Sequence, residues 1–237
     1  MPYDELWPGG PRFRQEEGSF RLSTDSVLLA HFAAPLRAKT VMDLGCGAGV
    51  LTVLLHVSHP EAQIGGIELQ SVSAALCRDN LTENGYDASG ILTGDLREHR
   101  SLLTAGAFDL VVSNPPYFAA DSGYTAPDAS RAAARDERTC TLDDVCTAAA
   151  YLTRWGGAFC MVHRPERLSE IFCTLTARGL EPKRLRMVQH REGAAPNLVL
   201  IEARRGGKPG LRIEAPLLLC APDGGDSSEV KEIYHRG

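Results

Sequence analysis

The sequence lacks the paired cysteines that mark a zinc centre or a disulfide scaffold. Its seven cysteines are scattered along the chain, and no two of them form a C-x-x-C pair. An odd, dispersed set of this kind is typical of reduced thiols in a cytoplasmic protein. We therefore expect a cytoplasmic location, no metal site, and thiols that are mostly buried in apolar surroundings.

Long apolar runs, a leader-like start and an excess of positive charge are also missing. No apolar run reaches the roughly 18 residues that cross a bilayer, and the first residues do not join a basic segment to an apolar one. The 237 residues carry 25 basic and 30 acidic side chains, a net charge of −5. We expect no membrane association, and a strongly cationic DNA-coating protein is disfavoured.

The positive charge that is present gathers in one stretch near the carboxyl end. Residues 178–212 hold nine basic side chains against three acidic ones. Such a stretch can present a basic face to a phosphate backbone, or it can be a solvated surface around two strands. The sequence leaves both interpretations open.

Hydrophobic residues make up 43% and charged residues 23% of the chain, which are ordinary values for a globular protein. Short runs of Val, Ile and Leu alternate with segments of helical period, which favours a mainly parallel sheet with helices on both faces. The last two strands can pair as a hairpin, and residues 205–237 indicate a tail packed on the sheet or a partly ordered end. We expect strands over 41–44, 64–69, 89–93, 108–113, 158–163, 185–189 and 198–203, and helices over 50–58, 71–83, 142–153 and 165–178.

A glycine loop stands between the first expected strand and the first helix after it. The segment Asp43-Leu44-Gly45-Cys46-Gly47-Ala48-Gly49 has the spacing G-x-G-x-G, which differs from the G-x-G-x-x-G of dinucleotide binders. Glycines here permit a tight turn and a close approach of the backbone to a ligand beside a helix N-terminus. Asp43 adds an acceptor or a counter-charge at the mouth of the loop. A plain strand-to-helix turn is the alternative.

Two further acids end neighbouring strands. Glu68 closes the second expected strand, where a carboxylate can accept two ribose hydroxyls in the crevice at the strand ends, although a solvated acid is the simpler interpretation. Asp95 follows the third strand. It can accept from an adenine amino group or cap the next helix, and the sequence does not choose between these roles.

The sharpest motif is Asn114-Pro115-Pro116-Tyr117, which follows the fourth expected strand. The two prolines remove backbone donors and stiffen the turn. The carbonyl of Pro115 and the amide oxygen of Asn114 can then face one point and each accept one N–H of an exocyclic amine. Tyr117 supplies a flat face for a base or another planar amide. The alternative is a rigid turn with a packed tyrosine.

Together these motifs resemble those of the class I S-adenosylmethionine-dependent amino N-methyltransferases. Finer features are similar to the bacterial tRNA1(Val) adenine-N6-methyltransferase family. The segment 20–29, which contains Thr24 and Asp25, resembles its entry segment, and residues 131–137 resemble a stretch that follows its N-P-P-Y motif. Asp136 stands where that family usually has histidine. The resemblance covers most of the chain.

The resemblance implies a Rossmann-like, doubly wound α/β fold with a seven-stranded, mostly parallel sheet and an antiparallel C-terminal strand. Residues 1–36 would form an arm and an entry helix that pack on a catalytic domain of residues 37–237. The implied cofactor is S-adenosylmethionine. Its binding residues would be Thr24, Asp25, Asp43, Gly45, Cys46, Gly47, Gly49, Glu68, Leu69, Asp95, Leu96 and Asn114, with Cys46 as a small packing residue of the loop.

The acceptor side follows from the same resemblance. The catalytic residues would be Asn114, Pro115, Pro116 and Tyr117, and Tyr117, Phe118, Arg131 and Arg135 would contact the substrate. The favoured reaction is methyl transfer to an exocyclic amine of a nucleobase, first of all adenine N6 in tRNA, with the base flipped or unstacked. No metal is required, and a monomer or a homodimer is expected.

Other functions remain open on the residues alone. The same pair of acceptors would serve guanine N2 in ribosomal RNA or the side-chain amide of a protein glutamine. More distant alternatives are a nucleotide-binding oxidoreductase and a catalytically silent nucleotide- or RNA-binding module.

Overall fold

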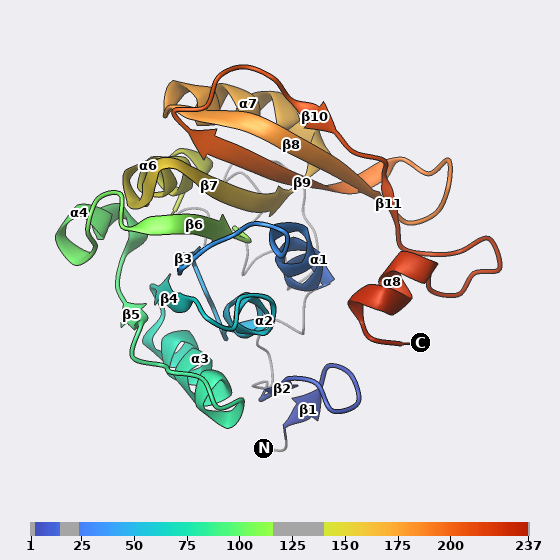
Figure 1. The fold of residues 1–237 in the computed structure, drawn as a ribbon, viewed down its shortest axis with the longest axis horizontal. Coiled ribbons are helices and arrows are strands. Elements are labelled where there is room, and N and C mark those ends of the chain that lie inside the picture. Colours follow the sequence, from blue (N-terminus) through green and yellow to red (C-terminus); the bar gives the residue numbers. More distant parts are fainter. Residues whose placement is uncertain (1–2, 15–23, 116–139, 237) are drawn as a thin grey trace, which may run out of the picture.

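The computed structural model describes residues 3–14, 24–115 and 140–236, and in these ranges its main element is a sheet of nine strands (Figure 1). The strand order is β10-β8-β9-β7-β6-β3-β4-β5, with β11 also paired to β8. β9 runs antiparallel to β7 and β8, and the other neighbouring pairs are parallel. The strands are β3 (Thr40–Leu44), β4 (Gln63–Glu68), β5 (Ile91–Thr93), β6 (Phe108–Ser113), β7 (Thr153–His163), β8 (Leu180–Gln189), β9 (Pro196–Arg205), β10 (Arg212–Ile213) and β11 (Leu217–Leu218).

This topology confirms the predicted α/β class and the mainly parallel sheet. The seven expected strands are β3 to β9, and the predicted hairpin is the antiparallel pair of β8 and β9. The predicted number of strands was too low by two, because β10 and β11 also pair with β8 at the edge of the sheet. These strands have two residues each, too few for a strand period to be visible in the sequence.

Helices cover both faces of the sheet (Figure 1). One side carries α1 (Thr24–Ala33), α2 (Val50–Ser58) and α3 (Ser71–Glu83), and the other carries α4 (His99–Leu102), α6 (Leu142–Leu152) and α7 (Leu168–Ala177). The short 3-10 turns η1 (Leu96–Glu98) and η2 (Pro165–Arg167) precede α4 and α7. The helices α2 and α3 have the predicted bounds. The strands β1 (Asp4–Glu5) and β2 (Arg12–Phe13) form a small separate sheet.

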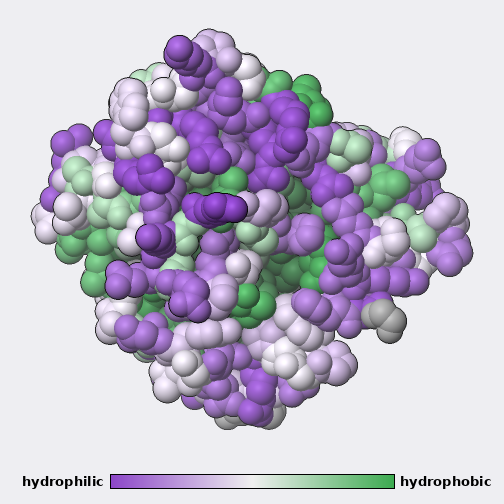
Figure 2. All heavy atoms as spheres, viewed as in Figure 1, coloured by the Kyte–Doolittle hydropathy of each residue, from purple (hydrophilic) through white to green (hydrophobic). Residues whose placement is uncertain are grey.

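The central strands are apolar at consecutive positions because both of their faces are buried. Successive side chains of a strand point to opposite faces. On β6, Leu110 and Val112 therefore join one core cluster with α1 and α2, whereas Val111 joins a second cluster with α6. The surface on the side of Figure 1 is mostly hydrophilic, and hydrophobic residues are scattered over it, some of them in a recess near the middle of the view (Figure 2).

The helix α1 belongs to the same core as the sheet. Val27, Leu28 and Leu29 are buried in the cluster that contains the inner residues of β6 and β7. The C-terminal helix α8 (Ser228–Ile233) adds Val230 and Ile233 to that cluster. The predicted boundary at residue 36 therefore does not separate two cores, and the division into an arm and a catalytic domain stays a prediction. None of the helices within the described ranges has the length and apolar character needed to cross a membrane.

Candidate active site

Several of the predicted site residues, among those that the structure describes, meet at one edge of the sheet, where the parallel strands end. Strand pairing places Leu44 opposite Ile67 and Ser113, and Glu68 opposite Thr93. The strands β3, β4, β5 and β6 therefore end at nearly the same level. The glycine loop follows β3, Glu68 is the last residue of β4, and Asn114 follows β6. In an open α/β sheet this edge forms the usual ligand crevice.

The glycine loop turns sharply because its glycines adopt left-handed backbone angles. Gly47 has φ 54° and Gly49 has φ 85°, and Gly49 caps the start of α2. A Cβ on Gly49 would lie 2.6 Å from the Cys77 sulfur, so this position has no room for a side chain. A Cβ on Gly45 or Gly47 would instead meet no described atom within 4 Å. The loop is thus tight against α3 and open on the side where a ligand can approach.

Glu68 ties the loop to the end of β4. Its Oε2 accepts a hydrogen bond from the Gly47 amide at 3.0 Å, and its Oε1 accepts one from the Gln70 amide at 2.8 Å. The residue is largely buried. Each carboxylate oxygen can accept a second hydrogen bond. The carboxylate is therefore held in place by backbone donors and retains the capacity to accept hydroxyl groups.

Asp43 is buried beneath the loop. The sequence suggested an acceptor or a counter-charge at the open mouth of the loop, and the carboxylate does not lie there. Its Oδ2 accepts a hydrogen bond from the Thr52 hydroxyl at 2.7 Å, and only 1% of the residue is exposed. Burial raises the pKa of Asp43 to about 7, the Thr52 bond opposes this rise, and the nearby charge of Glu68 adds to it. Thr52 was not predicted. Its position in the first turn of α2, opposite the end of β3, was the available signal.

Cys46 packs under the loop beside Cys77, and the two residues share a core cluster with Leu81. The hydrogen bond with Cys77 and burial raise the pKa of the Cys46 thiol well above its usual value. A thiol in this state is a poor nucleophile. All seven cysteines are free. Four of them are buried, in line with the expectation that most of the thiols are buried, and Cys173 is exposed.

Asp95 caps the turn that follows β5. Its Oδ1 accepts from the Arg97 amide at 2.9 Å, and its carboxylate pairs with the Arg97 guanidinium at 2.5 Å. Hydrogen bonds from Arg97 lower the pKa of Asp95. The capping role is thus present, and contact with an adenine stays a prediction. Leu69 is half-exposed at the rim of the crevice, and Leu96 is partly buried beside the α6 core.

Asn114 stands at the end of β6 and points toward α1. Its Nδ2 donates a hydrogen bond to the Ser26 hydroxyl oxygen at 3.0 Å. The preceding residue, Ser113, is buried and donates to the Leu44 carbonyl at 2.9 Å, which fastens the end of β6 to the end of β3. Pro115 is buried directly after Asn114. Ser26 was not predicted, although it lies within the segment 20–29 that the sequence singled out.

Thr24 and Asp25 begin α1, on the same side of the molecule as the crevice. Thr24 is exposed. Burial raises the pKa of Tyr234, and the nearby side chain of Thr24 opposes this rise. The predicted site residues Pro116, Tyr117, Phe118, Arg131 and Arg135 lie outside the described residues. Within the described ranges, no three His, Cys, Asp or Glu side chains gather closely enough to hold a metal ion.

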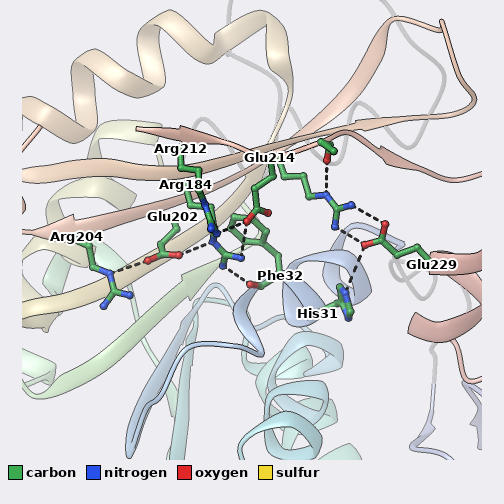
Figure 3. A network of polar contacts seen from close by, with 10 residues as sticks. His31, Phe32, Arg184, Glu202, Arg204, Arg212, Glu214 and Glu229 are labelled. Carbon is green, nitrogen blue, oxygen red and sulfur yellow. Dashed lines mark hydrogen bonds and ion pairs between the residues drawn. The ribbon is translucent and has the colours of Figure 1, made fainter. Parts of the chain in front are cut away.

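Five of the nine basic side chains of residues 178–212 pair with acids of the same molecule, so the stretch is not the continuous basic face that its composition allowed (Figure 3). Arg184 lies 2.8 Å from Glu202, and Arg186 lies 2.5 Å from Glu229. Other pairs in the stretch are Arg178 with Asp143, Arg204 with Glu202, and Arg212 with Glu214. Three of these acids lie outside residues 178–212, which explains why a local count of charges overestimated the basic character.

Known methyltransferases are similar to this chain in sequence. The family model for the methyltransferase small domain matches residues 22–165. A relative from Tolumonas auensis, named tRNA1(Val) (adenine(37)-N6)-methyltransferase, is 30% identical over 94% of this chain and 93% of its own length. A relative of the same name from Dickeya chrysanthemi is 32% identical over 86% of this chain and 82% of its own length.

Solved structures show the same fold at lower identity. A crystal structure described as a predicted O-methyltransferase from Agrobacterium tumefaciens has a TM-score of 0.73 and 22% identity, and the match covers 90% of this chain and 97% of that one. A geranyl diphosphate methyltransferase in complex with SAM has a TM-score of 0.52 and 15% identity, over 76% of this chain and 85% of that one.

Proposed function

The chain belongs to the methyltransferase small domain family, and on this premise we propose that it transfers a methyl group from S-adenosylmethionine to N6 of an adenine in tRNA. The observation that carries the proposal is the 30% identity to a tRNA1(Val) (adenine(37)-N6)-methyltransferase over nearly the whole of both chains. The position of Asn114 beside the glycine loop, on the shared strand-end edge, supports the same conclusion. We place the enzyme in the cytoplasm.

The loop and its flanking acids fit the proposed cofactor. The open side of Gly45 and Gly47 allows the backbone to approach a ligand closely. Glu68, held by two backbone amides, would accept the ribose hydroxyls. Asp43 lies below the loop that would line the methionine part of the cofactor, and its hydrogen bond with Thr52 ties the end of β3 to α2. When bound, S-adenosylmethionine supplies an electrophilic methyl carbon on a positively charged sulfur.

On the acceptor side, the side chain of Asn114 and the carbonyl of Pro115 would each accept one N–H of the adenine amino group. These hydrogen bonds draw the nitrogen lone pair out of conjugation with the ring and orient it toward the methyl carbon. A strong general base is not needed, because the nitrogen becomes cationic on methylation and its proton can then leave. The roles of Tyr117 and Phe118, which would hold the flipped base, are part of this proposal.

The proposal is tested with purified protein, labelled S-adenosylmethionine and unmodified tRNA transcripts. Mass spectrometry of the digested nucleosides should find the label in N6-methyladenosine. Label in N2-methylguanosine of ribosomal RNA, or in methylglutamine of a protein, with none in tRNA adenine, would refute the proposed acceptor.

Two variants test the assignment of roles in the same assay. Asn114→Ala should leave the affinity for S-adenosylhomocysteine nearly unchanged and lower the single-turnover rate by about 100-fold or more, because it removes an interaction made at the reacting amine. Glu68→Ala should mainly weaken binding of S-adenosylhomocysteine, measured by calorimetry. The opposite pattern would exchange the two roles and contradict the assignment.

A further inference from the structure

We propose that Ser26 is a positioning residue that holds the side-chain amide of Asn114 at the place where it meets the acceptor amine. This inference rests on the proposed function and adds a residue to its machinery. It starts from one contact: Asn114 Nδ2 donates to Ser26 Oγ at 3.0 Å, across 88 residues of sequence. Ser26 is 7% exposed, so water competes poorly for its hydroxyl.

The chemical need for such a residue comes from the freedom of the asparagine side chain. An amide oxygen accepts well from the N–H of an acceptor amine only when the planar amide group is held at a suitable distance and angle. The Ser26 hydroxyl accepts from Nδ2 here, and a hydroxyl can also donate to an amide oxygen, so this contact fixes the place of the amide group. With Nδ2 bound to Ser26, Oδ1 lies on the other branch of the planar group.

Both partners of this hydrogen bond are held by rigid surroundings. The Ser113 hydroxyl binds the Leu44 carbonyl, so the strand that leads into Asn114 cannot shift relative to β3. Ser26 lies in the first turn of α1, and the next turns of this helix bury Val27, Leu28 and Leu29 in the core. The hydroxyl of Ser26 is therefore presented at a fixed position.

The far end of α1 is also anchored (Figure 3). The Arg184 guanidinium donates to the Phe32 carbonyl at 2.6 Å and lies 3.7 Å from the centre of the Phe32 ring. A cation at the carboxyl end of a helix also interacts favourably with the helix dipole. Glu229 of α8 lies 3.9 Å from His31 and pairs with Arg186 of β8. These contacts fix α1 along its length, which is what a positioning residue requires of its support.

The kinetic test compares Ser26→Ala with Ser26→Thr, which keeps a hydroxyl. Ser26→Ala should lower the single-turnover rate of methyl transfer to tRNA by about tenfold, the usual effect of losing one hydrogen bond that orients a reacting group. The KM for tRNA, the affinity for S-adenosylhomocysteine and the thermal midpoint should stay close to the wild-type values. Ser26→Thr should recover most of the rate. The control is Ser58→Ala. The Ser58 hydroxyl binds the Leu54 and Leu55 carbonyls and the Nδ1 of His59 at the far end of α2 from the glycine loop, so the change should have no effect on the rate.

A second measurement does not depend on activity. In 15N-labelled protein with S-adenosylhomocysteine bound, the side-chain NH2 protons of Asn114 should exchange with solvent faster in Ser26→Ala than in the wild type. An unchanged rate in Ser26→Ala, an unchanged amide exchange, or a parallel loss of cofactor affinity without recovery by Ser26→Thr would each overturn the inference. If the wild type transfers no methyl group to tRNA adenine, the proposed function fails, and the amide exchange still decides the role of Ser26.

Discussion

Replacing Asp43 with asparagine should change how the stability of the protein depends on pH. Asp43 is buried at the end of β3, and burial raises its pKa from 3.8 to about 7, against the effect of the Thr52 hydrogen bond. Between these two values the folded protein keeps a proton that the unfolded chain has released. Raising the pH through this window therefore favours unfolding. The stabilising contribution of Asp43 is complete below 3.8 and is lost as the pH rises through about 7.

The magnitude follows from the same values. A tenfold change in an ionisation constant corresponds to about 1.4 kcal/mol, so the whole window is worth roughly 4 kcal/mol and the part between about pH 5 and pH 8 roughly 3 kcal/mol. The asparagine side chain of the Asp43→Asn variant does not titrate. The free energy of unfolding of the variant, relative to that of the wild type, should therefore rise by roughly 3 kcal/mol between about pH 5 and pH 8.

Urea unfolding followed by circular dichroism, at constant ionic strength across this pH range, measures the difference. The matched control is Asp109→Asn. Partial burial acts to raise the pKa of Asp109, but hydrogen bonds from Arg154 and from the backbone of Lys39 and Thr40 hold it below its usual value. The difference in free energy of unfolding between Asp109→Asn and the wild type should therefore not change with pH above about pH 5. If the Asp43→Asn difference is as flat as that of the control, Asp43 ionises as an ordinary carboxyl group and the reasoning is wrong.

Two further predictions concern stability and the glycine loop. Arg184→Met should lower the free energy of unfolding by about 3 kcal/mol, because it leaves the buried Glu202 with one cationic partner fewer, and Arg184→Met combined with Glu202→Leu should recover part of this loss in urea unfolding. An equal loss in both variants would show that the ion pair is not the cause. Gly49→Ala should destabilise the protein by about 2 kcal/mol or more and weaken binding of S-adenosylhomocysteine, since its φ is 85° and its Cβ would lie 2.6 Å from the Cys77 sulfur. Gly85→Ala, with φ 76° but open space around the Cβ, is the control and should cost only about 1 kcal/mol; similar losses at both glycines would contradict the steric argument.

The arrangement of the strand ends could be predicted from local patterns. Buried parallel strands are marked by short apolar runs, and each run is followed directly by the residue that the site uses, as with Glu68 after β4 and Asn114 after β6. Once the sheet is known to be parallel, these residues have to share an edge. The bounds of α2 and α3 were predictable for a similar reason, because glycine and proline residues mark their ends.

Features that depend on distant contacts were not predictable. The hydrogen bond between Ser26 and Asn114 joins positions 88 residues apart, and no sequence pattern around either residue indicates this contact. The strand β7 begins at Thr153 and runs through Gly156 and Gly157, whereas the sequence placed the end of a helix at residue 153 and the start of the strand at residue 158. Its early start depends on pairing of Thr153 with Phe108 across an irregularity in the register, and such pairing has no local signature.

The contacts between α1 and α8 have a consequence for how the enzyme is made. The helix that carries Ser26 is covered by Val230 and Ile233, and Glu229 joins it to β8 through Arg186. During synthesis α1 leaves the ribosome before α8, which covers it. The packing around α1 is therefore completed only after α8 has emerged, and a nascent chain stalled before residue 228 should hold α1 without this cover.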